Sequence, residues 1–215
     1  MEEYTIENQI AIYMTNKKLC EFNSKLQPAP VQYYAHVHAQ REKIGDSRMP
    51  TSAVGIVLQD YSNGTGEKTV RVSANLAPEF FEYALSQVES GTEKFNFYEE
   101  KIFGEPDAKG MSSVTKVSVK RASVGSDGKP RNYPWCIMVE NGFGVKETNP
   151  QGGMHMKQGS YQKAKCVYVN INDYDFYTLM KRTSRFIQAW ELTNAPKLIR
   201  DAMQISEAER KAAQK

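Results

Sequence analysis

Apolar and polar residues alternate along several short stretches of the chain, and such alternation predicts β-strands that bury one face. In the first stretch Ile10, Ile12 and Met14 share one side, while Tyr13 and Thr15 share the other. Two later runs are joined by the sequence SNGTG, which is typical of a tight hairpin. Four strands are therefore expected in the first part of the chain, at residues 7–18, 33–39, 54–59 and 69–74.

Apolar positions spaced three and four residues apart follow the strands and predict helices. The first helix is expected to begin at Pro78, because proline suits the first helical position. Its apolar stripe consists of Phe80, Phe81, Ala84, Leu85 and Val88. Asn172 is expected to cap a closing helix that presents Phe176, Leu179, Met180, Thr183, Ile187 and Trp190 on one side. Pro196 should end or kink this helix, and SEAERKAAQK should form a short helix of its own.

The order of these elements occurs twice, and repetition of this kind indicates a fold built from repeated units. KVSVKRASVGS from Lys116 aligns without a gap on HVHAQREKIGD from His36. In the same way CIMVENGFG in the second copy corresponds to GIVLQDYSNG in the first, and VYVNIND corresponds to VRVSANL. We expect an α+β fold of two tandem repeats, each with four antiparallel strands and one helix, related by a pseudo-twofold axis, with the helices covering one sheet face. The expected units are residues 1–92, 93–195 and a helical tail at 196–215; chance similarity between amphipathic strands is the other interpretation.

The second copy carries a long glycine-rich loop between its third and fourth strands, at residues 142–163. Loops of this length in a compact domain are often functional.

Composition excludes several classes of protein. Of the 215 residues 40% are hydrophobic and 25% are charged, which is ordinary for a globular protein, and the net charge is only +3. Cys20, Cys136 and Cys166 lack any C-x-x-C spacing, so we expect reduced core residues and no cofactor. The start MEEYTIEN is acidic, and no run approaches the roughly 20 apolar residues of a bilayer span. These features predict a soluble, cytoplasmic protein without a membrane partner.

The small net charge hides an uneven distribution. Residues 109–131 contain six basic residues against the single acidic Asp127. Strand parity places cations and rings together on the sheet face away from the core, whereas Trp135 shares parity with Ile137 and Val139 and is assigned to the core. Cations suit phosphates, and ring faces suit unstacked bases. The predicted binding residues are Tyr13, His36, His38, Arg41, Arg71, Lys116, Lys120, Arg121, Lys129, Arg131, Tyr133, Phe143, Lys146, Lys157, Tyr161, Lys163 and Tyr168.

Two copies of four strands and a helix, with a basic sheet face, resemble the Whirly and positive-cofactor-four class of single-stranded nucleic-acid-binding proteins. The closing segment CVYVNINDYDFYTLMKRTSRFIQAWE is similar to the last strand and long helix of that class. The resemblance implies non-catalytic, largely sequence-independent binding of single-stranded DNA or RNA, as in replication or recombination, and the class includes phage proteins. The chain lacks the Lys-Gly-Lys-Ala motif of plant Whirly proteins, and its tail is basic. Both a monomer and a homo-oligomer formed through the long C-terminal helix fit this pattern.

Three other interpretations remain open. The basic face can simply keep an exposed antiparallel sheet soluble. His36 and His38 are two apart on a predicted strand, and with His155 from the long loop they offer three imidazoles for a catalytic metal. The same loop and face can also serve a protein-interaction module or inhibitor from a phage or mobile element.

Overall fold

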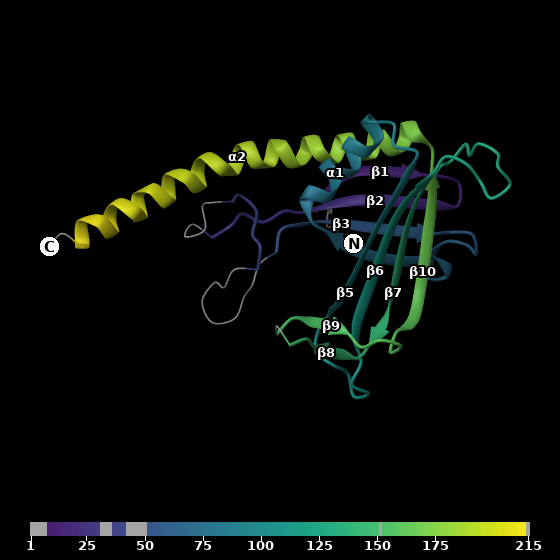
Figure 1. Cartoon of the computed structure of the whole chain (residues 1–215), viewed down its shortest axis with the longest axis horizontal. Helices are drawn as coiled ribbons and strands as arrows, with labels where there is room; N and C mark the ends of the chain where they lie inside the picture. The colour runs from purple at the N-terminus through teal and green to yellow at the C-terminus, as the bar shows by residue number, and fades with distance from the viewer. Residues whose placement is uncertain (1–7, 31–35, 42–50, 151, 214–215) are drawn as a thin grey trace.

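The computed structural model describes residues 8–30, 36–41, 51–150 and 152–213, and it is an α+β fold with two antiparallel sheets of four strands (Figure 1). The first sheet has the strand order β1 (Gln9–Met14), β2 (Lys18–Lys25), β3 (Ala53–Asp60) and β4 (Val70–Leu76). The second has the order β10 (Gln162–Ile171), β7 (Trp135–Gly144), β6 (Ser112–Ala122) and β5 (Lys94–Phe103). A 3₁₀ turn, η2 (Gly66–Lys68), lies in the hairpin between β3 and β4.

The second strand of the first sheet is not the predicted one. It is β2, whereas residues 36–41 form only isolated bridges, Pro28 with His38 and Gln40 with Thr51. The alignment of His36 on Lys116 is therefore wrong, because residues 116–121 lie inside β6 and residues 36–41 lie in no sheet strand. Residues 33–35 of the predicted strand lie outside the described part of the chain. Each half nevertheless has one four-stranded antiparallel sheet followed by a helix, and in the second half two further short strands stand between the third and fourth strands of the sheet.

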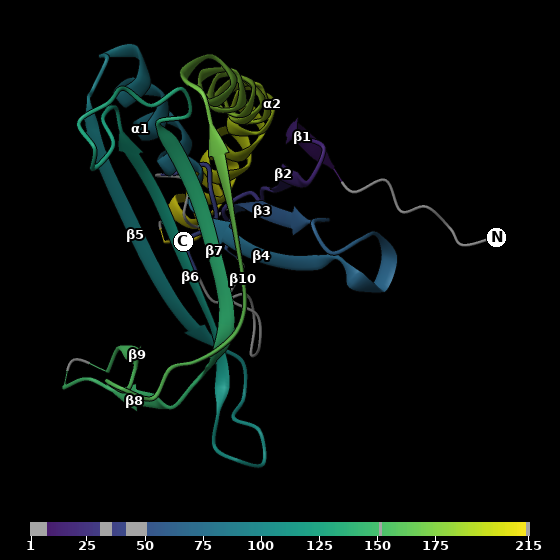
Figure 2. The same cartoon turned by 90° about the vertical axis from the view of Figure 1, so that its right-hand side faces the viewer.

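The inner faces of the two sheets share one apolar core. Ile56 and Leu58 of β3 belong to the same buried cluster as Ile137 and Val139 of β7 and Val167 of β10. Figure 2 shows the strands of the two sheets crossing at a steep angle, with β4 beside β7 and β10. The burial of large apolar side chains on both inner faces is the main stabilising term of the fold.

Hydrogen bonds also join the sheets at the edge strand β4. The Ser73 amide donates to Asn141 Oδ1 at 2.9 Å, and Asn141 Nδ2 donates to the Ser73 carbonyl at 2.8 Å. The Asn141 side chain thus satisfies both main-chain groups of one edge residue, as a neighbouring strand would.

Helix α1 (Pro78–Glu89) confirms its predicted start and apolar stripe. Phe81 lies 5.2 Å from Phe22, and Phe80 lies 4.4 Å from Phe97, measured between ring centroids, so α1 contacts both sheets. Gly91, with φ of 67°, provides the left-handed residue after the helix, and the Thr92 amide then donates to the Gln87 carbonyl.

Helix α2 (Asp173–Ala213) is capped by Asn172, whose Oδ1 accepts the Asp175 amide at 2.8 Å. It does not end at Pro196, and the predicted separate tail helix is wrong. The proline removes the donor for the Leu192 carbonyl, but Leu192 is 77% exposed, so water can satisfy that group. The helix packs against α1 and β1 and then extends past both sheets (Figure 1).

The long loop of the second half folds into a small hairpin, β8 (Lys146–Thr148) with β9 (Met154–Met156). No helix in the described ranges is long and apolar enough to cross a membrane.

Candidate nucleic-acid interface

The outer face of the second sheet is the face turned away from the shared core, and its side chains form rows across the four strands. One row consists of the register partners Tyr98, Ser118, Met138 and Tyr168. The next row consists of Asn96, Lys120, Cys136 and Asn170. The Tyr98 and Tyr168 side chains at the ends of the first row are 55% and 48% exposed. Neighbouring strands lie about 4.8 Å apart, so these two positions are roughly 14 Å apart.

Positive charges surround the second row. Burial raises the pKa of the Cys136 thiol, and three positive charges oppose this rise. They come from Lys18, Lys120 and Arg131. Cys136 is half-buried on this face, so its assignment to the core is wrong.

Lys18, which was not predicted as a site residue, reaches the outer face from β2. Its Nζ lies 3.6 Å from the Tyr168 ring centroid and donates to the Tyr168 carbonyl at 2.7 Å. Asp60 holds it from the other side, at 3.6 Å. The sequence could not predict this contact, because nothing in it indicates that a basic residue at the start of a strand in the first sheet will reach the edge of the second sheet.

Carboxylates neutralise the opposite end of this face. Glu100 and Glu140 are the register partners of Lys116 on the two neighbouring strands. Lys116 Nζ lies 3.2 Å from Glu100, and Lys163 Nζ lies 3.8 Å from Glu140. Of the six basic residues counted between residues 109 and 131, Lys116 is therefore neutralised in this row, whereas Lys120 and Arg131 lie near Cys136.

Two tyrosines extend this neutral end. Tyr161 lies over Lys116, with Nζ 3.7 Å from the ring centroid, and its hydroxyl donates to Glu140 at 3.3 Å. The Tyr98 hydroxyl donates to Glu100 at 3.0 Å. Burial and the neighbouring carboxylates raise the pKa of both phenols to about 12. Both phenol hydroxyls consequently stay protonated at neutral pH and add no negative charge to the face.

Three predicted binding residues belong to the structural framework instead. Tyr13 is partly buried and packs against the core, on the same side of β1 as the buried Ala11. Arg121 points to the side opposite Lys120, where Nε and Nη2 bind Asp173 at 3.1 and 3.2 Å and Nη1 donates to the Thr92 carbonyl at 2.6 Å. His38 is buried and cannot serve an open face.

The remaining predicted residues lie outside the two rows. Tyr133 is exposed at the β6–β7 connection, and Lys129 is in the turn before it. Arg71 lies on the exposed side of β4, Phe143 lies at the far end of β7, and Lys146 Nζ donates to the Gly104 carbonyl. Lys157 follows β9, His36 contacts the His38 carbonyl through Nδ1 at 2.7 Å, and Arg41 lies beside a cleft between the sheets.

The three histidines do not converge. His38 Nδ1 lies 2.8 Å from Ser52 Oγ, and its Nε2 lies 3.0 Å from Glu191, while its ring stacks on Trp190. His155 lies on the β8–β9 hairpin, 3.7 Å from Glu147. Among the described residues no group of three or more His, Cys, Asp or Glu side chains is placed to hold a metal ion. The metal-enzyme interpretation thus has no support in this geometry.

Comparison with protein-family models, with curated proteins and with solved structures finds no match for this chain. The resemblance to the Whirly and positive-cofactor-four class accordingly stays a prediction from the sequence.

Proposed function

We propose that the outer face of the second sheet binds single-stranded nucleic acid without catalysis and largely without regard to sequence. The observation that carries this proposal is the arrangement of two exposed tyrosines, Tyr98 and Tyr168, in one row and of Lys18, Lys120 and Arg131 around the next. Rings and cations side by side on an open sheet are the two components that such binding needs.

The separation of the tyrosine row from the cations near Cys136 suggests a path for the bound nucleic-acid strand. Unstacked bases would lie on the row of Tyr98 and Tyr168, and phosphates would lie beside the cations near Cys136. Since Lys18 covers one side of the Tyr168 ring, the base would stack on the other side. Each stacked base contributes roughly 1–3 kcal/mol, whatever its identity. The Glu100 and Glu140 row would repel phosphates and limit the site at that end.

The fold supports the same proposal at a coarser level. We propose that the two halves are copies related by a pseudo-twofold axis, with α1 and α2 covering apolar surface so that the outer face of the second sheet stays open. The order of strands and helix in each half and the packing of α1 on α2 support this relation.

We also propose that the protein forms a homo-oligomer through the outer part of α2. Leu192, Ile199 and Met203 are spaced by seven and four residues along one side of this helix, and all three are exposed. An exposed apolar stripe of this spacing is the pattern that a second helix covers.

Fluorescence anisotropy of a labelled oligothymidylate tests the binding face, at two salt concentrations. K120A with Y168A should weaken binding at least tenfold, because one phosphate contact and one stacked base are lost. E140Q should tighten binding several-fold, because a carboxylate beside the strand becomes neutral. Control K197A, on the exposed surface of α2, should behave like the wild type. Absence of binding by the wild type at low salt, or equal affinities for all four proteins, would reject the proposal.

A further inference from the structure

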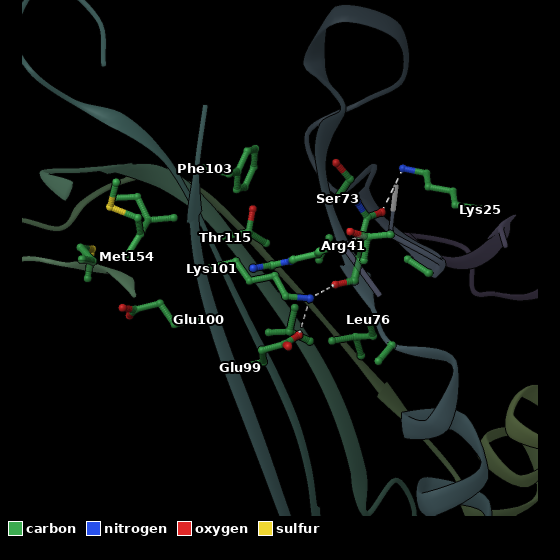
Figure 3. Close-up of a pocket in the computed structure, with 18 of the residues that line it drawn as sticks. Lys25, Arg41, Ser73, Leu76, Glu99, Glu100, Lys101, Phe103, Thr115 and Met154 are labelled. Carbon is green, nitrogen blue, oxygen red and sulfur yellow. Dashed lines mark hydrogen bonds and ion pairs between the residues drawn. The ribbon is translucent and has the colours of Figure 1, made fainter. Parts of the chain in front are cut away.

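A cleft of about 810 Å³ lies on the other side of the second sheet, away from its outer face. Its walls are the edge strand β4, the inner side of β5 and β6, and the β8–β9 hairpin (Figure 3). A volume of this size is typical of pockets that hold small organic ligands.

Two lysines are held at one asparagine in this cleft. Lys25 Nζ donates to Asn75 Oδ1 at 3.0 Å, and Lys101 Nζ donates to the Asn75 carbonyl at 2.9 Å. Fixing two ammonium groups at one residue costs electrostatic energy unless an anion lies between or beside them. Gly55 makes room for this arrangement, since a Cβ at that position would lie 3.0 Å from Lys25 Cε.

A third cation, Arg41, extends into the cleft toward the wall formed by Lys101 and Thr115 (Figure 3). Within the described part of the chain its guanidinium has no hydrogen bond or ion pair. Arg41 also has φ of 70°, and it is the one described non-glycine residue with a positive φ. Residues held in this conformation are uncommon and tend to lie at functional sites.

The charges inside the cleft do not balance. Glu99 lies 3.1 Å from Lys101 Nζ. Glu100 also lines the cleft, but its carboxylate lies 3.2 Å from Lys116 Nζ and its charge is neutralised there. Three cations against one carboxylate leave a surplus of two positive charges. A phosphate monoester carries nearly two negative charges at neutral pH, and a carboxylate or an internal phosphodiester carries only one. The charge thus favours a phosphomonoester.

Apolar side chains complete the lining. Phe103 at the end of β5 is 51% exposed, and Met154 on the hairpin is 63% exposed, although both line the cleft. A ring and a thioether beside a cationic pocket suit a flat aromatic group. We propose that the cleft binds a nucleotide through its terminal phosphomonoester, with the phosphate at Arg41 and Lys101 and the base against Phe103 and Met154. A free mononucleotide and the phosphorylated end of a nucleic-acid strand share this chemistry. Binding of a strand end rests on the proposed function, and binding of a free mononucleotide does not.

Isothermal titration calorimetry of the whole chain with thymidine 5′-monophosphate, thymidine and inorganic phosphate tests the site. The nucleotide should bind at least tenfold more tightly than either of the other two, and R41Q should weaken its binding at least tenfold. R185Q is the matched control, because Arg185 is exposed on α2 and does not line the cleft. Equal affinities for nucleotide and nucleoside, or an R41Q variant with wild-type affinity, would overturn the proposal. Tighter binding of an acidic peptide, lost in R41Q, would overturn it in favour of a protein ligand.

A second comparison separates this site from the outer face. The K120A and Y168A double variant should keep its affinity for thymidine 5′-monophosphate, and R41Q should keep its affinity for an oligothymidylate with a 5′-hydroxyl. A 5′-phosphate on that oligonucleotide should raise its affinity for the wild type and not for R41Q. Loss of mononucleotide binding in the double variant would overturn the cleft as a separate site. Failure of oligonucleotide binding alone would reject the proposed function and leave the cleft supported.

Discussion

Arg121 and Lys120 are neighbours in the sequence and lie on opposite sides of β6. Arg121 joins three parts of the fold, because it binds Asp173 at the start of α2 and the Thr92 carbonyl before β5. Trp135 Nε1 donates to the same carboxylate at 2.8 Å, and its ring stacks on Phe176 at 3.8 Å. The two basic side chains therefore have different roles, although their neighbouring positions in the sequence suggest the same role.

R121A should lower the free energy of unfolding by about 2 kcal/mol, because hydrogen bonds to charged, partly buried groups are lost. K120A should change stability by less than about 0.5 kcal/mol, as exposed substitutions do, while it weakens oligonucleotide binding. Urea denaturation of both variants checks the first effect, and anisotropy checks the second. Equal stability of the two variants would show that Arg121 does not hold α2 to the sheet.

Asp173 gives the fold a dependence on pH. Hydrogen bonds from Arg121 and Trp135 hold the pKa of the Asp173 carboxyl below its usual value of 3.8, against the opposing effect of burial. A carboxyl with a lowered pKa stabilises the folded state above its unfolded pKa, and this contribution is lost as the pH falls through the folded pKa.

The difference in unfolding free energy between the wild type and D173N should accordingly be constant above about pH 5 and should shrink below about pH 4. Urea denaturation from pH 7 to pH 3 measures this difference. D127N is the control, because Asp127 lies in an exposed turn, where its carboxylate accepts the Lys129 amide at 3.1 Å. A difference that stays unchanged down to pH 3 would contradict the role assigned to Asp173.

At the scale of elements, β4, α1 and β10 could be predicted because each has a regular apolar period, and β3 because it is a short continuous apolar run. β2 was missed because KLCEFNSK places polar Asn23 in a buried position and so breaks the expected pattern. Residues 36–41 alternate in the same way as a strand, yet their partners are the short segments around Pro28 and Thr51. Periodicity reports which side chains are buried, and it does not report which backbone a segment pairs with.

The candidate site was predictable only in part for a related reason. Strand parity correctly placed Lys116, Lys120 and Tyr168 on one face of the second sheet. It did not give the neighbours of that face, so the neutralising Glu100 and the added cation Lys18 were missed. Cross-strand neighbours depend on register, and register is set by the whole sheet.

The outer part of α2 should mediate self-association if its apolar stripe is covered by a second copy. L192E with I199E should convert an oligomer into a monomer, since charges would be buried at the contact. Q204E is the control, because Gln204 is exposed on another side of the same helix. Light scattering after size-exclusion chromatography gives the mass of each variant. A monomeric wild type at high concentration would contradict this proposal and leave the binding face unaffected.

At the scale of the whole molecule, two crossed sheets create two different surfaces around one core. The outer face of the second sheet presents rings and cations to solvent, and the cleft between the sheets collects Lys25, Arg41 and Lys101. A single-stranded nucleic acid on the outer face and a nucleotide in the cleft would occupy opposite sides of β5 and β6. The two sites can consequently be tested separately in one protein.

The central claim is that single-stranded nucleic acid lies on the outer face of the second sheet, and methyl NMR of the chain's nine methionines tests it directly. Met138 lies in the row between the two exposed tyrosines, Met180 is in the core, and Met14 is on the first sheet. On addition of an oligothymidylate with a 5′-hydroxyl, the Met138 methyl signal should shift while the Met14 and Met180 signals stay in place. A shift of Met14 with an unchanged Met138 would contradict the account.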